Sequence, residues 1–129
     1  MTLFQNVKVF DGRSGQLTAP TSVLVVGNAI DQIRRDITAP EKALVIDAGG
    51  RTLMPGLIDA HWHAMLVRPT AAEALSWDVG YTNLVAAAEA TDTLLRGFTT
   101  VRDLGGPVFG LARAIDQGVV TGPRIYPSG

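Results

Sequence analysis

The sequence predicts an α/β protein in which a small β-domain precedes alternating strands and helices. In the first half, short β-branched runs end at turn signals such as Asp11-Gly12 and Gly27-Asn28. In the second half, apolar strand-like runs alternate with segments of helical periodicity. Strands that alternate with helices form right-handed βαβ units around a parallel sheet. We therefore expect the architecture to change near Met54, just before the chain turns at Pro55-Gly56.

The first half reads as a series of short strands. Gly27-Asn28 separates two apolar runs by two residues, which predicts a β-hairpin. A phosphate-approaching turn is the alternative, but no GxGxxG pattern surrounds these residues. The expected strands are Leu3–Phe10, Ser22–Val26, Ala29–Ile33, Ala43–Asp47 and Thr52–Leu53.

The second half opens with Leu57–His61, a nearly continuous apolar run that is typical of a strand buried on both faces. Its main helix is expected over Thr82–Arg96, with Thr82 as the N-cap and Gly97 as the stop. The apolar stripe expected to face the core consists of Leu84, Ala88, Thr91 and Leu95. The remaining elements are a short helix over Ala71–Leu75, a strand over Thr99–Asp103, a helix over Val108–Gln117 and a strand over Arg124–Ser128.

Two histidines one residue apart end the apolar run. His61 and His63 are the only histidines in the chain. Side chains at positions i and i+2 of a strand point to the same side, so the two imidazoles can converge on one ion. The chain has no cysteine, so any metal must be held by nitrogen and oxygen atoms. The pair predicts a metal site, and the alternative is a pair of ordinary core or surface histidines.

Three motifs in order resemble the amidohydrolase superfamily. Leu53–His63 resembles the first barrel strand of that superfamily, where the pattern PGxIDxHxH closes with two metal-binding histidines. Gly97–Gly106 and Gly122–Gly129 resemble the next two barrel strands of its imidazolonepropionase-like and Xaa-Pro dipeptidase-like branch. The opening segment resembles the small β-domain that precedes the barrel in that branch.

The resemblance implies a definite domain organisation. Residues 1–53 would form a small N-terminal β-sandwich-like domain, and residues 54–129 would form the first βα units of an incomplete (β/α)8 TIM barrel. A complete barrel takes about 250 residues, and the chain has 129. We therefore expect the sequence to be an N-terminal piece of a larger enzyme.

The resemblance also implies a chemistry. In the family, one or two Zn²⁺ or other divalent ions activate a water molecule that hydrolyses C–N bonds in amides, cyclic amides or dipeptides. His61 and His63 match the first two metal ligands. The later ligands and the aspartate that shuttles the proton are expected beyond residue 129. No catalytic residue is therefore expected within this chain, and the chain alone is not expected to be active.

Two aspartates are candidates for an indirect role near the metal. Asp59 shares its strand face with the histidines, and its carboxylate could orient a metal-binding imidazole. The alternative is a buried carboxylate satisfied by backbone groups or by a neighbouring arginine. Asp103 lies at the C-terminal end of the second strand, the level from which barrel enzymes draw functional residues. In the family this aspartate is not a metal ligand, so we expect it either to have a structural role or to support the metal ligands.

Composition excludes several classes of protein. The 11 Lys and Arg residues are scattered and aromatics make up 6% of the chain, so a nucleic-acid surface is not expected. No apolar run approaches the roughly 18 residues of a membrane span, and no secretory signal is visible at the N-terminus. We expect a cytoplasmic protein whose partner is a small amide or dipeptide-like substrate.

Two non-enzymatic alternatives stand beside the hydrolase. The chain could be an inactive truncated module that self-associates through open barrel edges, because unpaired strand edges invite pairing. Either a homo-oligomer or pairing with the missing C-terminal part would cover those edges. A collapsin-like relative without activity is disfavoured, since such proteins usually lose the HxH pair that this chain keeps.

Overall fold

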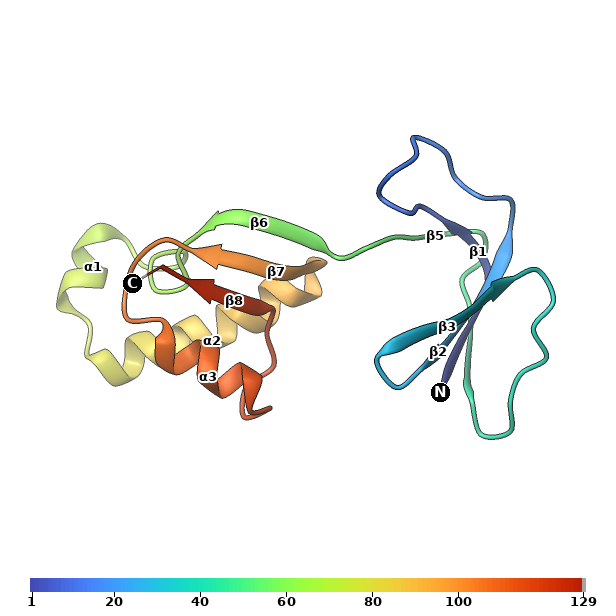
Figure 1. Ribbon diagram of the computed structural model, residues 1–129. Helices are drawn as coiled ribbons and strands as arrows, with labels where there is room; N and C mark the ends of the chain where they lie inside the picture. The colour runs from blue at the N-terminus through green and yellow to red at the C-terminus, as the bar shows by residue number, and fades with distance from the viewer. Residues whose placement is uncertain (129) are drawn as a thin grey trace. The chain divides into compact units, whose positions relative to one another are not determined.

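The computed structural model describes residues 1–128 and divides into two compact units, Met1–Pro55 and a second that begins at Gly56. The first unit is a sheet of short strands in the order β3-β2-β1-β4, with β5 paired to the end of β1 (Figure 1). The β1–β2 and β2–β3 pairs are antiparallel, whereas β4 and β5 run parallel to β1. Its strands are β1 (Thr2–Val9), β2 (Thr21–Val26), β3 (Ala29–Arg34), β4 (Leu44–Asp47) and β5 (Thr52–Leu53).

All five strands expected in the first half are confirmed, and their ends differ from expectation by no more than one residue. The hairpin between β2 and β3 is also confirmed. Its turn requires a left-handed backbone at Gly27 (φ 61°), which glycine adopts without steric cost. Two small apolar clusters stabilise the unit, one around Leu3 and Leu24 and the other around Val7 and Val23.

The second unit is a three-stranded parallel sheet in the order β6-β7-β8. Figure 1 shows α2 and α3 packed against the same face of this sheet. Its core joins the sheet to these helices through Trp62, Ala86, Ala90, Val101 and Leu111. The elements are β6 (Leu57–Trp62), α1 (Ala71–Ser76), α2 (Val79–Leu95), β7 (Phe98–Asp103), α3 (Phe109–Asp116) and β8 (Arg124–Pro127). The mixed α/β class and the parallel βαβ order are therefore confirmed.

The main helix differs from the prediction at its start. It begins at Val79, and its N-cap is Asp78, whose carboxylate accepts the backbone N–H groups of Gly80 and Tyr81. The expected cap, Thr82, lies inside the helix and donates its hydroxyl to the Asp78 carbonyl. Asp78 satisfies the free N–H groups of the first turn, so the helix can include Gly80 despite its low helix propensity.

The buried face of α2 also differs from the prediction. Leu84 and Leu95 of the expected stripe are 71% and 79% exposed. The buried residues of α2 are instead small or polar, namely Ala86, Glu89, Ala90 and Thr93. The alanines let the helix approach the sheet closely, and Glu89 is neutralised by arginines described below. The helical periodicity of the sequence does not by itself show which of these two faces is buried.

The strand β6 is not buried on both faces as expected. Ile58 is 70% exposed, and only Trp62 is buried along the strand. The reason is that β6 pairs with β7 on one edge only, and α2 and α3 cover one face of the sheet (Figure 1). Within residues 1–128, none of the helices combines the length and apolarity that a membrane crossing requires.

Candidate metal centre

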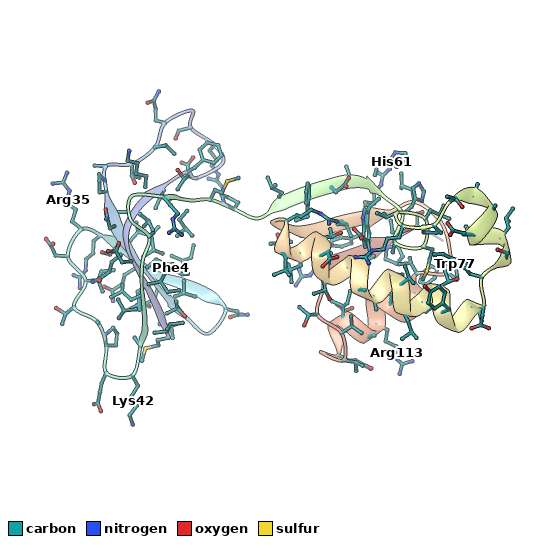
Figure 2. All side chains as sticks on the ribbon, turned by 180° about the vertical axis from the view of Figure 1, so that it is seen from behind. Phe4, Arg35, Lys42, His61, Trp77 and Arg113 are labelled. Carbon is teal, nitrogen blue, oxygen red and sulfur yellow. The ribbon has the colours of Figure 1, made fainter. Side chains whose placement is uncertain are left out.

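The histidine pair lies where β6 ends and the next loop begins. The backbone there is irregular, since the β6–β7 register shifts between Asp59 and Trp62. The N–H of Leu104 donates to the carbonyl of Trp62 (3.0 Å), which keeps the C-terminal ends of β6 and β7 side by side. His61 is exposed and His63 is half-buried. Figure 2 shows the His61 side chain on the side of the sheet away from the helices.

The two imidazoles face each other through the same ring atom. The Nε2 atoms of His61 and His63 are 3.3 Å apart, and the rings meet edge to face with centroids 5.2 Å apart. Two neutral imidazoles can form one N–H···N hydrogen bond across such a contact, with one nitrogen donating and the other accepting. The structure therefore brings together the two residues that the sequence singled out.

This geometry fits a shared ion. Imidazole nitrogen is a common ligand of zinc, and the two Nε2 atoms, 3.3 Å apart, would be the atoms that hold one ion. No third His, Asp or Glu side chain joins the pair among residues 1–128. The two histidines could hold a divalent ion, but they fill only part of its coordination shell.

The other ring nitrogen of His63 is enclosed. Its Nδ1 atom is buried and has no hydrogen-bond partner in the described part of the chain. Gly105 lies beside this edge of the ring, and a Cβ atom built on it would be 3.8 Å from both Nδ1 and Cε1 of His63. Enclosure of Nδ1 leaves Nε2 as the accessible nitrogen of His63, which is the one that faces His61.

Asp59 is held by the backbone of the strand. Its Oδ1 atom accepts the N–H of His61 (3.0 Å), and its side chain is half-buried. The contact fixes the main chain of His61, and among residues 1–128 the Asp59 carboxylate makes no hydrogen bond to either imidazole ring. Asp59 therefore lies next to the pair and stabilises the backbone that carries it.

Asp103 is fully buried at the end of β7. Its Oδ2 atom accepts the N–H of Ala64 (2.7 Å), the residue directly after His63, and its Oδ1 atom accepts the N–H of Gly105 (3.1 Å). Neither carboxylate oxygen contacts the histidine rings through a hydrogen bond among residues 1–128. Asp103 thus bonds to the backbone directly after His63 and to the backbone of the loop after β7.

With this geometry in place, comparison with known proteins identifies the family. Residues 52–129 match the amidohydrolase family, and the match covers more than half of the chain. The chain belongs to the amidohydrolase family. The resemblance carried by the three sequence motifs is confirmed.

Several relatives of this amidohydrolase are similar over most of its length. A Xaa-Pro dipeptidase with bound methionine is 31% identical with a TM-score of 0.86, and the similarity covers 99% of this chain and 33% of that one. A prolidase crystallised with N-methylphosphonate-L-proline is 33% identical with a TM-score of 0.87, covering 99% and 31%. The dihydroorotase of Streptococcus thermophilus is 38% identical over 101 residues, which are 78% of this chain and 21% of that one. The chain spans about a fifth of this curated relative and about a third of the solved structures.

The loop that leaves the histidine pair in this amidohydrolase is anchored to α2 by a buried carboxylate that the sequence did not reveal. Glu89 accepts the Nε–H of Arg68 (2.7 Å), and it also accepts hydrogen bonds from Arg96 and from the hydroxyl of Thr93. Arg68 pairs in addition with Asp92. The spacing of Glu89, Thr93 and Arg96 along one helix could have suggested contacts among them. The loop partner, Arg68, lies 21 residues before Glu89, so no short-range sequence pattern indicates this contact.

These contacts set the charge of the anchor. Burial alone would raise the pKa of Glu89, but the hydrogen bonds from Arg68 and Arg96 outweigh it, so the pKa of Glu89 lies below its ordinary value. The hydrogen bond to Glu89 in turn raises the pKa of Arg68. The anchor is therefore a charged cluster at neutral pH, and it holds the loop that follows His63.

Proposed function

We propose that this chain is the N-terminal part of a metal-dependent amidohydrolase that hydrolyses C–N bonds in amide, cyclic amide or dipeptide-like substrates. The observation that carries the proposal is the 3.3 Å approach of the Nε2 atoms of His61 and His63 at the C-terminal end of β6. Membership of the amidohydrolase family supports it. So does the similarity to a dihydroorotase and a Xaa-Pro dipeptidase, which act on such bonds.

In this proposal, His61 and His63 hold Zn²⁺ or another divalent ion through their Nε2 atoms. Such an ion would supply a water molecule of lowered pKa and would polarise the carbonyl that is attacked. Asp59 holds the backbone of His61 in place, and Nδ1 of His63 is buried on the side of the ring where Gly105 lies. The residues of this chain thus bind and orient, and they move no proton.

The domain organisation is part of the same proposal. Residues 1–53 form the small N-terminal β-sandwich-like domain, and residues 54–129 begin a TIM barrel of which the β6-β7-β8 sheet is the first part. The remaining metal ligands and the proton-shuttling aspartate come from later strands of the barrel. The enzyme works in the cytoplasm on a small-molecule substrate. The 129-residue chain alone should not turn over substrate.

Calorimetric titration of the purified chain with ZnCl₂ tests the metal site. We expect one ion per chain, and His61→Ala or His63→Ala should weaken binding at least about tenfold, as loss of one of two ligands requires. Asp116→Asn, which removes an exposed charge on α3, is the control and should bind zinc as the wild type does. Zinc binding that is unchanged in both histidine variants would contradict the proposal.

An activity assay tests the incompleteness of the site. The chain is incubated with zinc and either dihydroorotate or an Xaa-Pro dipeptide, and product is followed by chromatography. We expect no turnover by the chain alone. Turnover that requires His61 would show that two histidines are enough and would refute the proposed need for later ligands.

A second candidate is the inactive module that self-associates. The observation that favours it is the exposure of Ile58 on a strand whose outer edge pairs with nothing among residues 1–128. Sedimentation velocity at several concentrations separates the two candidates. A stable oligomer that binds no zinc favours the module, whereas a chain that binds zinc through His61 and His63 favours the hydrolase.

A further inference from the structure

Asp103 is a buried carboxylate without a cationic partner. It is 0% exposed, and the ion pairs of residues 1–128 join only Arg68, Glu89, Asp92 and Arg96. A buried charge is tolerated only when other polar groups satisfy it. Here two backbone N–H groups do so, and both belong to loops that leave strand ends. The buried carboxylate of Asp103 is therefore satisfied only where these two loops meet the end of β7.

The contacts of Asp103 join the ends of all three strands of the second unit. Its carboxylate bonds to Ala64 after β6 and to Gly105 after β7. Its own carbonyl accepts the N–H of Ser128, directly after β8 (2.9 Å). One residue therefore fixes the positions of three C-terminal strand ends relative to one another.

Two of these contacts bear directly on His63. Ala64 follows His63, so the 2.7 Å bond to the Ala64 N–H fixes the main chain from which the His63 ring extends. Gly105 is held by the other oxygen, and it lies against the ring edge that carries Nδ1. The carboxylate thus constrains both the attachment point of the ring and the wall beside it.

We propose that Asp103 is a positioning residue that sets the approach of His63 to His61. The inference rests on the proposed function and deepens it, because Asp103 would hold His63 in position for the proposed metal site before any ion binds. Groups that orient metal ligands typically change metal affinity about 10- to 100-fold when they are altered. Asp103 does so through the backbone and not through the imidazole itself.

The test compares Asp103→Asn with the wild type. Asparagine keeps the shape of the side chain, but its NH₂ group would face one of the two backbone N–H donors, so one bond is replaced by a repulsive contact. We expect Asp103→Asn to bind Zn²⁺ about 10- to 100-fold more weakly in calorimetry. Asp116→Asn removes the same charge at an exposed position and should leave zinc affinity unchanged. A purely structural role would lower stability without changing the zinc affinity of the folded chain.

A metal-free measurement separates this inference from the proposed function. The nuclear Overhauser effect between the ring protons of His61 and His63 should be present in the wild type and lost in Asp103→Asn. If the wild type binds no zinc but the effect is lost in the variant, the metal function fails and the positioning role stands. If the variant keeps both the effect and the zinc affinity, the positioning role is overturned.

Amide hydrogen exchange of the wild-type chain tests the inference even if Asp103→Asn does not fold. In the wild-type chain, the amides of Ala64 and Gly105 should exchange as slowly as amides within β7, although neither residue lies in a strand. Exchange at the rate of exposed loop amides would overturn the inference without any variant.

Discussion

Replacing Glu89 by glutamine should destabilise the second unit. The carboxylate is only 5% exposed and accepts hydrogen bonds from Arg68, Arg96 and Thr93. Glutamine keeps the length and volume of the side chain. It removes the charge, however, and turns a donor toward the arginines. The perturbation is therefore electrostatic and leaves the packing of α2 unchanged.

The expected loss of unfolding free energy depends on how exposed Arg68 and Arg96 are. Removing one member of a fully buried ion pair costs about 3–5 kcal/mol, because the remaining charge is stranded. Here the side chains of Arg68 and Arg96 are 41% and 53% exposed, so each can regain water when the carboxylate is lost. The loss then approaches that of a charge-assisted hydrogen bond, about 1.5–3 kcal/mol. We expect about 2 kcal/mol, which corresponds to a fall in Tm of about 8–16 °C for a unit of this size.

Tryptophan fluorescence isolates the relevant unit. The chain has two tryptophans, Trp62 and Trp77, and both lie after Gly56. Urea unfolding followed by their emission therefore reports the second unit alone. Asp92→Asn is the matched control, since Asp92 is half-exposed and its one ion pair within residues 1–128 is with Arg68, and it should change the unfolding free energy far less. A Glu89→Gln value within about 0.5 kcal/mol of the wild type, or equal to the control, would refute the reasoning.

The same residue predicts a pH dependence. The pKa of Glu89 in the folded chain is lowered from its model-compound value of 4.5, which applies to the unfolded chain. A lowered folded pKa means that the unfolded state binds more protons. The stabilisation is complete above about pH 4.5 and is lost as the pH falls through the folded pKa. Glu89→Gln should therefore show a flatter decline of unfolding free energy in acid than the wild type.

Three further variants test other features of the second unit by the same fluorescence assay. Asp78→Ala removes the N-cap of α2 and should cost about 1 kcal/mol, and no change would mean that the cap contributes nothing. Gly122→Ala places a methyl group 3.0 Å from the Cβ of Ala90, which cannot rotate away, and should cost about 1–3 kcal/mol from overpacking, so an unchanged unfolding free energy would contradict it. Gly110→Ala, inside α3 with open space around it, should instead stabilise by up to about 1 kcal/mol, and destabilisation there would contradict the helix-propensity argument.

The features predicted correctly from the sequence are those that depend on residues close together along the chain. Turn signals such as Gly27-Asn28 and apolar runs of four to eight residues placed the strands, because those signals act within a few residues of one another. The histidine pair was visible for the same reason, since an i, i+2 spacing on a strand brings two side chains together without any distant partner.

One error was local: the start of α2 was placed at Thr82, whereas Asp78 caps the helix and Val79 begins it. The other errors arose where distant residues decide the outcome. The buried face of the helix was misassigned because Glu89 is neutralised by Arg68 from another element, which no periodicity indicates. Burial of β6 was overestimated because apolar composition does not state how many strands and helices cover a strand.

The parallel pairing of β6 with β7 fixes the order in which the centre is assembled during synthesis. A parallel partner needs a crossover connection, and here the contact between Ala64 and Asp103 spans 39 residues. At a synthesis rate of about 5–20 residues per second, that stretch takes about 2–8 s to follow the histidines out of the ribosome. During that interval, β7 cannot pair with β6, and Asp103 cannot yet accept the N–H of Ala64. The histidine pair is therefore made well before the residue that bonds to the backbone beside it.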